Sequence, residues 1–305
     1  MNNALVTVIL PCFNGEEFLS PAIESILTQS YERLELIIID DGSTDNSAAI
    51  ITGFKDDRIT FLQQENSGKA KAVNRALDLA KGDYWVLQDA DDISHKNRLQ
   101  SMIAILEDDP SLGAVFSGND LIINGEIVAP RFEPLTRMRC KELVNKLKLP
   151  AHDACGMYRT SCTTDLRFDE SLRIGQGVDF VFRFAELHEI ELAGKCLYSH
   201  RINHSSTTHR SRSSNQSSIN CVFEKACKRR GTPFTPVLER RSFISKLFPH
   251  RDKDNFISYA VESVAQLRRA NQLRKALQTA WFCIKRHPLD PLFYKPFFRL
   301  FVLGR

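Results

Sequence analysis

Short apolar runs alternate with segments of helical spacing along the first third of the chain. The apolar runs predict four strands, namely Leu5–Leu10, Leu34–Ile39, Ile59–Gln63 and Tyr84–Leu87. The first two are β-branched and lack strict alternation, which is typical of strands buried on both faces. Between the runs, apolar residues recur every three or four positions, which predicts helices. This repeat of strand, loop and helix predicts βαβ units and an α/β fold with a mostly parallel sheet.

Polar residues follow each of the four expected strands. They are Pro11–Asn14, Asp40–Asp41, Gln64–Gly68 and Asp89–Asp92. Parallel sheets bind ligands beyond the carboxyl ends of their strands, so these residues should converge on one rim. Asp, Asn and Gly also favour ordinary turns, which would account for any one of these loops. Four such loops together favour a ligand site.

Three carboxylates occur within four residues after the fourth strand, at Asp89, Asp91 and Asp92. Clustered carboxylates repel one another unless a positive charge lies among them. Mg²⁺ and Mn²⁺ prefer hard oxygen ligands and leave coordination positions for phosphate oxygens. A helix N-cap would account for Asp92 but not for the other two. On the residues alone, a divalent metal site and a capped helix both stay open.

Four ordered motifs resemble those of family 2 glycosyltransferases, which are inverting enzymes with the GT-A fold. The motifs are Pro11-Cys-Phe-Asn14, Asp40-Asp-Gly-Ser43 followed by Asp45, Asn66-Ser-Gly68 with Asn74, and Asp89-Ala-Asp-Asp92. The resemblance runs from about Val6 to Leu99. It implies a GT-A-like, Rossmann-like domain with a mostly parallel central sheet flanked by helices. It also implies a nucleotide-sugar donor, UDP-linked by family analogy, and Mn²⁺ or Mg²⁺ as cofactor.

The resemblance further assigns roles to single residues. The implied donor-binding residues are Pro11, Asn14, Asp41, Asn66, Gly68, Asp89, Asp91 and Arg201. Among them, Asp41 should contact the nucleotide base, while Asp89 and Asp91 should serve the ribose and the metal. Asp91 and Asp92 are both metal-ligand candidates, and their order is left open. Arg201 resembles the arginine of the family's Arg-x-His strand, although Asn203 replaces the histidine and His204 comes one residue later.

Gly177-Val178-Asp179 resembles the family's Gly-Glu-Asp, whose aspartate is the catalytic base. Inverting transfer needs one base, because the acceptor oxygen displaces the nucleoside diphosphate in a single step. Without the family, a carboxylate in the first turn of a helix is the simpler interpretation of Asp179. Val178 in place of Glu leaves a catalytically impaired nucleotide-sugar-binding protein as the alternative. A sugar nucleotidyltransferase is disfavoured, because Pro11–Gly15 replaces the Gly-rich, Arg-containing loop of that class.

His152 lies next to Asp153, a pair that suits acid–base chemistry. An oriented surface histidine is the interpretation that the sequence favours.

Composition restricts the class of protein without identifying it. The 305 residues are 43% hydrophobic and 26% charged, with a net charge of +4, as in ordinary soluble proteins. The mild charge gives no indication of nucleic-acid binding, and we expect none. We identify neither a run of about 18 apolar residues nor a signal peptide. Eight cysteines without a Cys-x-x-Cys pair predict reduced thiols and a cytoplasmic protein.

We expect a glycosyltransferase domain over residues 1–220 and a C-terminal helical region over 221–305. The domain should contain a nucleotide-sugar-binding half (1–118) and an acceptor-binding half (119–220), and the Ser-rich stretch 205–220 is interpreted as a loop. The expected acceptor is a saccharide or a lipid-linked molecule of surface polysaccharide or glycolipid synthesis, by family analogy. The basic aromatic tail 292–305 suits contact with the inner membrane surface, although docking on its own domain is the simpler interpretation.

Overall fold

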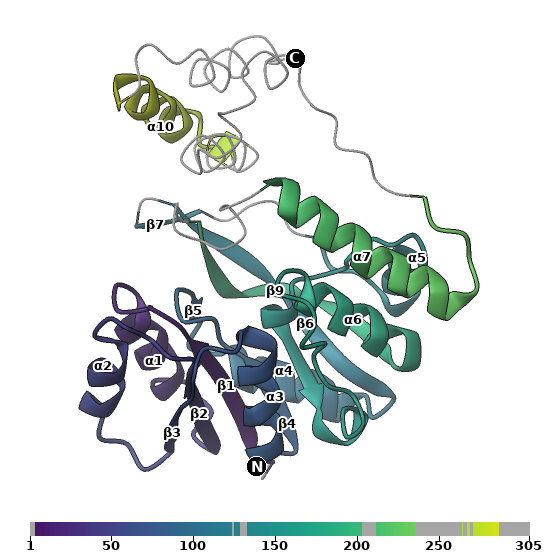
Figure 1. The fold of residues 1–305 in the computed structure, drawn as a ribbon, viewed down its shortest axis with the longest axis horizontal. Coiled ribbons are helices and arrows are strands. Elements are labelled where there is room, and N and C mark those ends of the chain that lie inside the picture. The colour runs from purple at the N-terminus through teal and green to yellow at the C-terminus, as the bar shows by residue number, and fades with distance from the viewer. Residues whose placement is uncertain are drawn as a thin grey trace. The chain divides into compact units, whose positions relative to one another are not determined.

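The computed structural model describes residues 4–123, 125–128, 133–202, 212–235, 264, 267–268 and 271–286. The chain divides into two compact units (Figure 1). The first comprises Met1–Asn119, Phe132–His200 and Cys221–Phe234, and the second comprises Asp120–Arg131, Arg201–Asn220 and Thr235–Arg305. The boundaries predicted after residues 118 and 220 stay predictions.

The first unit is built on a mixed sheet with the strand order β3-β2-β1-β4-β8-β6-β9-β5. The strands are β1 (Val6–Cys12), β2 (Leu34–Asp40), β3 (Ile59–Gln63), β4 (Tyr84–Leu87), β5 (Ile93–Ser94), β6 (Leu112–Ile123), β8 (Gly156–Arg159) and β9 (Glu189–Ile202). β1 pairs in parallel with both β2 and β4, and β2 pairs in parallel with β3. β8 is antiparallel to β4 and β6. The predicted four-stranded parallel core is therefore confirmed, and the sheet continues from it in mixed orientation.

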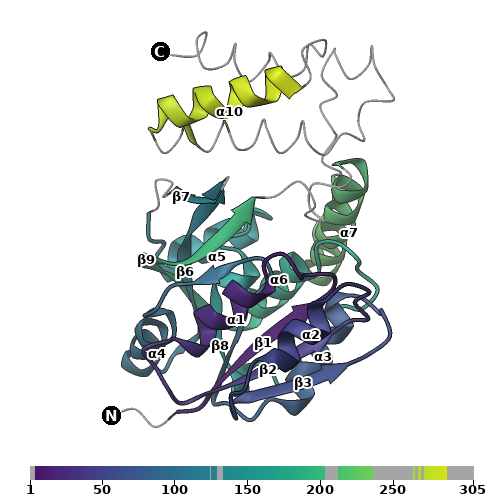
Figure 2. The same ribbon diagram turned by 90° about the vertical axis from the view of Figure 1, so that its left-hand side faces the viewer.

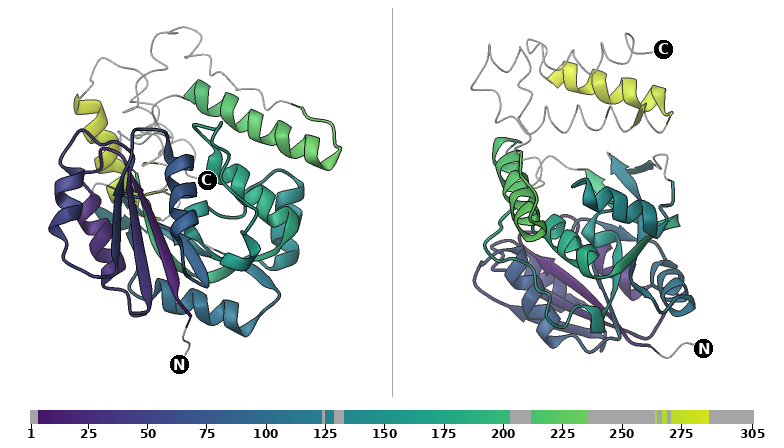
Figure 3. Two further views of the ribbon diagram at one scale, coloured as in Figure 1. Left: turned by 60° about the horizontal axis from the view of Figure 1, so that its bottom comes forward. Right: turned by 90° about the vertical axis from the view of Figure 1, so that its right-hand side faces the viewer.

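Helices cover both faces of this sheet (Figures 2 and 3). They are α1 (Leu19–Leu27), α2 (Ser47–Gly53), α3 (Lys69–Leu79), α4 (Arg98–Asp108), α5 (Arg137–Asn145) and α6 (Gln176–Leu187), with the short 3₁₀ helices η1 (Asp153–Cys155) and η2 (Thr160–Cys162). Alternate strand residues such as Val8 and Val86 pack against α1, α2 and α4 on one face. Their neighbours Ile9 and Leu87 pack against α3 and α6 on the other. Strands buried on both faces explain the continuous apolar runs in the sequence.

An aromatic cluster fixes α6 to the sheet. Trp85 of β4 is fully buried and stacks on Tyr158 of β8 with ring centroids 4.3 Å apart. Phe180 of α6 meets Trp85 edge to face at 5.6 Å and stacks on Phe168 at 4.2 Å. Full burial of each such ring contributes about 1.5–3 kcal/mol. The first turn of α6 is consequently held in a fixed position relative to β4.

The second unit contains the end of β6, β7 (Glu126–Val128), the start of α7 (Arg212–Arg230) and α10 (Leu273–Arg286). β6 and β7 form an antiparallel hairpin with Leu121 opposite Val128. Leu121, Ile123 and Ile202 share one apolar cluster with residues of α10 such as Ala276 and Ala280. The interpretation of 205–220 as a loop is wrong from Arg212 onward, where α7 begins. Favourable packing of the later turns, which bury Val222 and Ala226, extends a helix into weakly helix-forming residues.

Several predictions about the C-terminal third fall on residues outside the described ranges. These residues include His204 and the tail 292–305. Contact of the tail with a membrane surface therefore stays a prediction. Among the described residues, no helix is long and apolar enough to span a bilayer. The cysteines whose side chains are described are all free thiols, as expected.

A substitution at Gly82 would test how tightly the backbones of β1 and β4 pack around this residue. A Cβ at this position would lie 2.5 Å from the amide nitrogen of Thr7 and 2.6 Å from the carbonyl oxygen of Tyr84. Both are backbone atoms, so Gly82→Ala should lower the free energy of unfolding by about 1–3 kcal/mol in urea denaturation. The control is Gly53→Ala at the end of α2, where a Cβ meets nothing within 4 Å. That variant should match wild type or gain up to about 1 kcal/mol, and equal stability of the two variants would contradict the assignment.

Candidate active site

The loops after β1 and β2 are joined by hydrogen bonds. The Asn14 side-chain oxygen accepts from the Thr44 amide at 2.8 Å, and the Asn14 amide donates to Ser43 Oγ at 2.9 Å. Asn14 has a φ of 49°, a left-handed conformation that asparagine tolerates better than most residues. Pro11 is buried within β1, whereas Phe13 is 51% exposed between it and Asn14. The first loop therefore presents an aromatic ring and an amide to solvent at the rim.

Asp41 organises the loop after β3. Its carboxylate is only 4% exposed and accepts hydrogen bonds from the amides of Ser67 at 2.9 Å and Gly68 at 2.8 Å. The side chain of Gln64 donates to it at 2.7 Å. Gly68 has a φ of 95°, which a residue with a side chain rarely adopts, and Asn66 is exposed. The structure thus brings Asp41 and Gly68 together, while contact of Asp41 with a base stays a prediction.

The Asp89–Asp92 loop is folded around two buried polar side chains. Gln88 donates to the carbonyl oxygens of Asp89 at 3.0 Å and Asp92 at 2.9 Å. Arg98, fully buried at the start of α4, donates to the carbonyl oxygens of Leu87 at 3.1 Å and Ala154 at 2.5 Å. Both side chains also bond to Ser94 Oγ, at 2.6 Å for Gln88 and 2.8 Å for Arg98. The buried guanidinium of Arg98 is therefore hydrogen-bonded to the backbone at the end of β4.

Cationic side chains pair with Asp89 and Asp92 in this loop. Lys69 Nζ lies 2.5 Å from Asp89 Oδ1, and His200 Nδ1 lies 3.2 Å from Asp92 Oδ2. Burial alone would raise the pKa of Asp89, but Lys69 holds it below the ordinary value. Burial alone would lower the pKa of His200, but the Asp92 carboxylate raises it to about 9. For Asp91, burial and then the carboxylates of Asp92 and Asp89 raise the pKa to about 6.

His152 and Asp153 extend this group of charges. Asp153 Oδ1 lies 3.3 Å from His152 Nδ1, and the rings of His152 and His200 are 5.5 Å apart. Asp153 also acts electrostatically on Lys69, together with Asp89. We call Asp89, Lys69, Asp153, His152, His200 and Asp92 the charged ring. The His152 side chain is 44% exposed and accepts a hydrogen bond from the Ala154 amide, which agrees with its interpretation as an oriented surface histidine.

Lys69 and His200 are not among the residues that the sequence predicts for the site, although Lys69 directly follows Gly68 and His200 directly precedes Arg201. That adjacency to expected donor residues was the available signal for both. For Asp153 the signal was its place next to His152, whereas its other neighbours in space come from α3 and α6.

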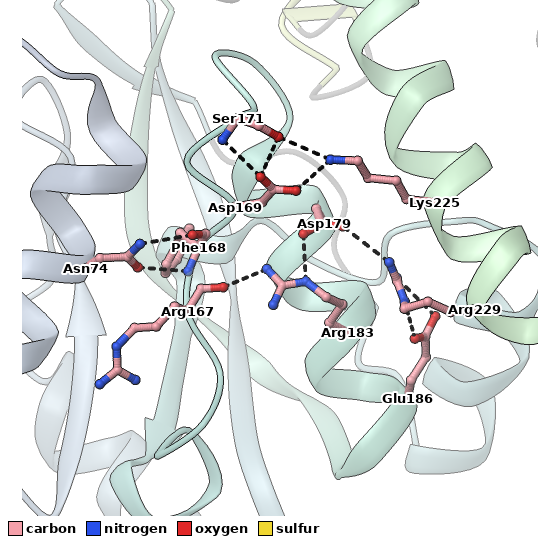
Figure 4. Close-up of polar contacts among 10 residues, drawn as sticks. All are labelled: Asn74, Arg167, Phe168, Asp169, Ser171, Asp179, Arg183, Glu186, Lys225 and Arg229. Atoms are coloured by element: carbon pink, nitrogen blue, oxygen red, sulfur yellow. Dashed lines mark hydrogen bonds and ion pairs between the residues drawn. The ribbon is translucent and has the colours of Figure 1, made fainter.

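Asp179 lies in the first turn of α6, as predicted, and is paired with arginines (Figure 4). Arg183 Nε donates to its Oδ2 at 2.7 Å, and an Arg229 nitrogen lies 3.6 Å from its Oδ1. Arg229 also binds Glu186 at 2.9 Å. The Asp179 side chain is 2% exposed, and its Oδ1 accepts no hydrogen bond from the residues that the structure describes. Its assignment as the base stays a prediction.

Polar contacts also fix the loop that precedes α6 (Figure 4). The Asn74 side chain of α3 both donates to and accepts from the backbone of Phe168, at 2.9 and 2.8 Å. Lys225 of α7 binds Asp169 at 2.6 Å. Burial alone would raise the pKa of Asp169, but Lys225 and Ser171 lower it to about 2. Asn74, a motif residue, therefore connects α3 with the loop leading to α6.

Arg201 follows His200 in β9, is half-buried and belongs to the second unit. Its contact with a diphosphate stays a prediction.

The residues present suit a metal that is shared with a substrate. Among the described residues, no group of three or more His, Cys, Asp or Glu side chains is arranged to hold a metal ion. Mg²⁺, however, is usually held by one or two carboxylates together with substrate phosphates. Burial, and then the carboxylates of Asp92 and Asp89, raise the pKa of Asp91, and a bound cation would favour its ionised form. Asp91 and Asp92 therefore fit such a site as oxygen ligands.

Comparison with known proteins identifies the class. The model of the family described as "Glycosyl transferase family 2" matches residues 7–166. The chain belongs to this family, and the resemblance inferred from its motifs is confirmed.

The relatives include glycosyltransferase GlyG of Streptococcus pneumoniae, 41% identical over 101 residues. Those residues are 32% of this chain and 34% of GlyG. Poly-beta-1,6-N-acetyl-D-glucosamine synthase of Staphylococcus aureus is 37% identical over 132 residues, which are 43% of this chain and 32% of the synthase. The chain thus matches about a third of the length of these curated relatives.

A crystal structure of S. aureus TarS 1-349 in complex with UDP-GlcNAc superposes with a TM-score of 0.60 at 18% identity. The superposition covers 90% of this chain and 81% of the TarS chain. At this identity the likeness shows the fold alone, and it confirms the predicted GT-A-like α/β architecture.

The raised pKa of Asp91 predicts a pH-dependent cost to stability. The group contributes stability below its ordinary pKa of 3.8, and that contribution is lost as pH rises through about 6. At pH 7.5 without metal, Asp91→Asn should therefore raise the free energy of unfolding by up to about 3 kcal/mol. The gain should shrink steadily between pH 7 and pH 4 in urea denaturation.

The matched control is Asp57→Asn, at an exposed site, which should change stability little at either pH. A gain in the free energy of unfolding for Asp91→Asn that stays constant from pH 7 to pH 4 would argue against ionisation of the Asp91 carboxylate as its cause.

Proposed function

We propose that this protein transfers a sugar from a UDP-linked donor to a hydroxyl acceptor with inversion, assisted by Mn²⁺ or Mg²⁺. The observation that carries the proposal is the convergence of Asp41, Asp91 and the charged ring at the carboxyl ends of β1, β2 and β4. This is the edge at which parallel α/β sheets bind nucleotides. Membership of glycosyltransferase family 2 supports the reaction class.

Two similar proteins support the kind of substrate. The TarS structures contain UDP or UDP-GlcNAc, and the S. aureus relative is a poly-beta-1,6-N-acetyl-D-glucosamine synthase. A UDP-sugar is therefore the preferred donor and a saccharide the preferred acceptor, with a lipid-linked saccharide as a further form. Synthesis of a surface polysaccharide or glycolipid at the cytoplasmic side of a membrane is the setting in which such substrates meet.

In this proposal the loops after β1 and β3 bind the nucleoside. The exposed ring of Phe13 can stack on a base, because aromatic rings provide a flat apolar surface. Asn14 and Asn66 are exposed on these two loops and can bond to polar edges of the nucleoside. Asp41 keeps the loop after β3 in place by accepting hydrogen bonds from the Ser67 and Gly68 amides. It lies close enough to this loop to contact a base bound there.

The Asp89–Asp92 loop and its cations serve the diphosphate. Asp91 and Asp92 would hold the metal ion, which supplies positive charge against the leaving nucleoside diphosphate. Lys69 and His200 carry further positive charge around the loop, where their carboxylate partners orient them. One carboxylate near the sugar must then remove the proton of the acceptor hydroxyl. Two carboxylates are candidates for this role: Asp179, which the sequence predicts, and Asp153, which lies 3.3 Å from His152.

Release of free nucleoside diphosphate from a panel of UDP-sugars with Mn²⁺ tests the function, because water can replace the unknown acceptor. Wild type should release UDP from one sugar preferentially, and chelation by EDTA should stop the reaction. Asp91→Ala should reduce release about a hundredfold or more, since a metal ligand contributes several kcal/mol to the transition state. Asp57→Ala, at an exposed site far along the chain from the loop, should act like wild type.

The alternative, a nucleotide-sugar-binding protein without turnover, predicts a different result in the same panel. Metal-dependent donor binding would then be measurable by calorimetry while no UDP is released, even after saccharide acceptors are added. If no nucleotide sugar binds at all, both functions are wrong.

A further inference from the structure

The backbone of Gly177 lies directly against the carboxylate of Asp153. A Cβ built on Gly177 would lie 2.1 Å from Asp153 Oδ2 and 2.3 Å from its Cγ. Asp153 in η1 therefore fills the space that a side chain at residue 177 would take. Because the aromatic cluster fixes the first turn of α6, this contact also fixes where the Asp153 carboxylate lies.

Asp153 belongs to the charged ring, whereas Asp179 pairs with arginines outside it. Asp153 acts on Lys69, whose ammonium binds Asp89, and it contacts His152 at 3.3 Å. Residues two apart on a helix do not share a face, so Gly177 and Asp179 point in different directions. Asp179 accordingly meets Arg183 and Arg229 (Figure 4).

The surroundings of the two carboxylates suit different roles. Asp179 is 2% exposed and lies 2.7 Å from Arg183 and 3.6 Å from Arg229. These contacts are typical of a structural ion pair. Asp153 is 9% exposed, and the histidine beside it is 44% exposed. A general base needs a lone pair that an acceptor hydroxyl can reach, close to the reacting carbon. Of these two carboxylates, Asp153 is the more accessible and is the one beside the donor loop.

We propose that Asp153 is the general base of this transferase; this rests on the proposed function. In the step, the acceptor oxygen forms a bond to the anomeric carbon while the bond from that carbon to the diphosphate oxygen breaks. The nucleoside diphosphate leaves with the electron pair, and the hydroxyl proton passes to the Asp153 carboxylate. Gly177 is required because any side chain there would displace that carboxylate.

The first experiment compares Asp153→Asn with the matched Asp179→Asn in the full chain. The donor is the UDP-sugar that wild type hydrolyses fastest with Mn²⁺. Asp153→Asn should lower kcat for UDP release by about 10²–10⁴-fold while UDP affinity changes little. Asp179→Asn should keep kcat within about tenfold of wild type and act mainly on the stability of the α6–α7 contact. Near-normal kcat in Asp153→Asn, or a large loss confined to Asp179→Asn, overturns the proposal.

A relocated carboxylate provides the second test. Gly177→Asp alone should destabilise the protein, because the new side chain overlaps Asp153. Asp153→Ala combined with Gly177→Asp removes the overlap and places a carboxylate in the same space from the helix side. This double variant should regain at least about tenfold in kcat over Asp153→Ala. A folded, UDP-binding double variant that regains nothing overturns the proposal.

Failure of the proposed function gives a different result from failure of this inference. If wild type releases no UDP from any donor, even with saccharide acceptors added, the transferase function is wrong, and the assignment of a base is overturned with it. If wild type turns over and only the ranking of the Asp153 and Asp179 variants is reversed, the function holds and the base is Asp179.

Discussion

The arrangement of the site depends on the compensation of carboxylate charge at the end of β4. Asp89, Asp91 and Asp92 lie in one short loop, and Asp153 approaches it from η1. Like charges at this spacing repel strongly in a partly buried site. Arg98 is placed beneath the loop, fully buried, and its bonds to the Leu87 and Ala154 carbonyl oxygens connect the end of β4 with η1. Removing this cation would leave buried carbonyl acceptors without donors and would take away one of the positive charges that act on Asp89 and Asp92.

Lys69 pairs with Asp89, and His200 pairs with Asp92. Burial, and then the carboxylates of Asp92 and Asp89, raise the pKa of Asp91, one of the two expected metal ligands, to about 6. A fold selected only for stability would replace such a carboxylate, because its ionisation at neutral pH disfavours the folded state. Keeping it makes sense if a cation that arrives with the donor completes the charge balance. Local instability at Asp91 and affinity for a metal–diphosphate are then two results of one arrangement.

The sequence predicts the parts of this site that local patterns encode. Apolar runs buried on both faces define β1 to β4, and the carboxyl ends of parallel strands must share an edge, so Asp41 and Asp91 could be assigned to one rim. The partners of these residues could not be predicted in the same way. His200 is 108 residues from Asp92 and lies beside it because β9 pairs antiparallel with β5, with Ser199 opposite Ile93. The contact of Asp153 with Gly177 likewise depends on how η1 and α6 pack, which no periodicity records.

The two candidate bases show why a motif alone does not assign a catalytic role. Its position in a three-residue motif predicts Asp179 as the base, yet a helix turns by about 100° per residue and each side chain meets a different neighbour. At this site α7 supplies Arg229 to the face that carries Asp179, so that this carboxylate contributes to packing of α6 against α7. The face that carries Gly177 meets Asp153, which belongs to the charged ring. A carboxylate from another element can therefore occupy the catalytic space when the helix itself offers only a glycine there, and geometry rather than motif position decides which oxygen the acceptor meets.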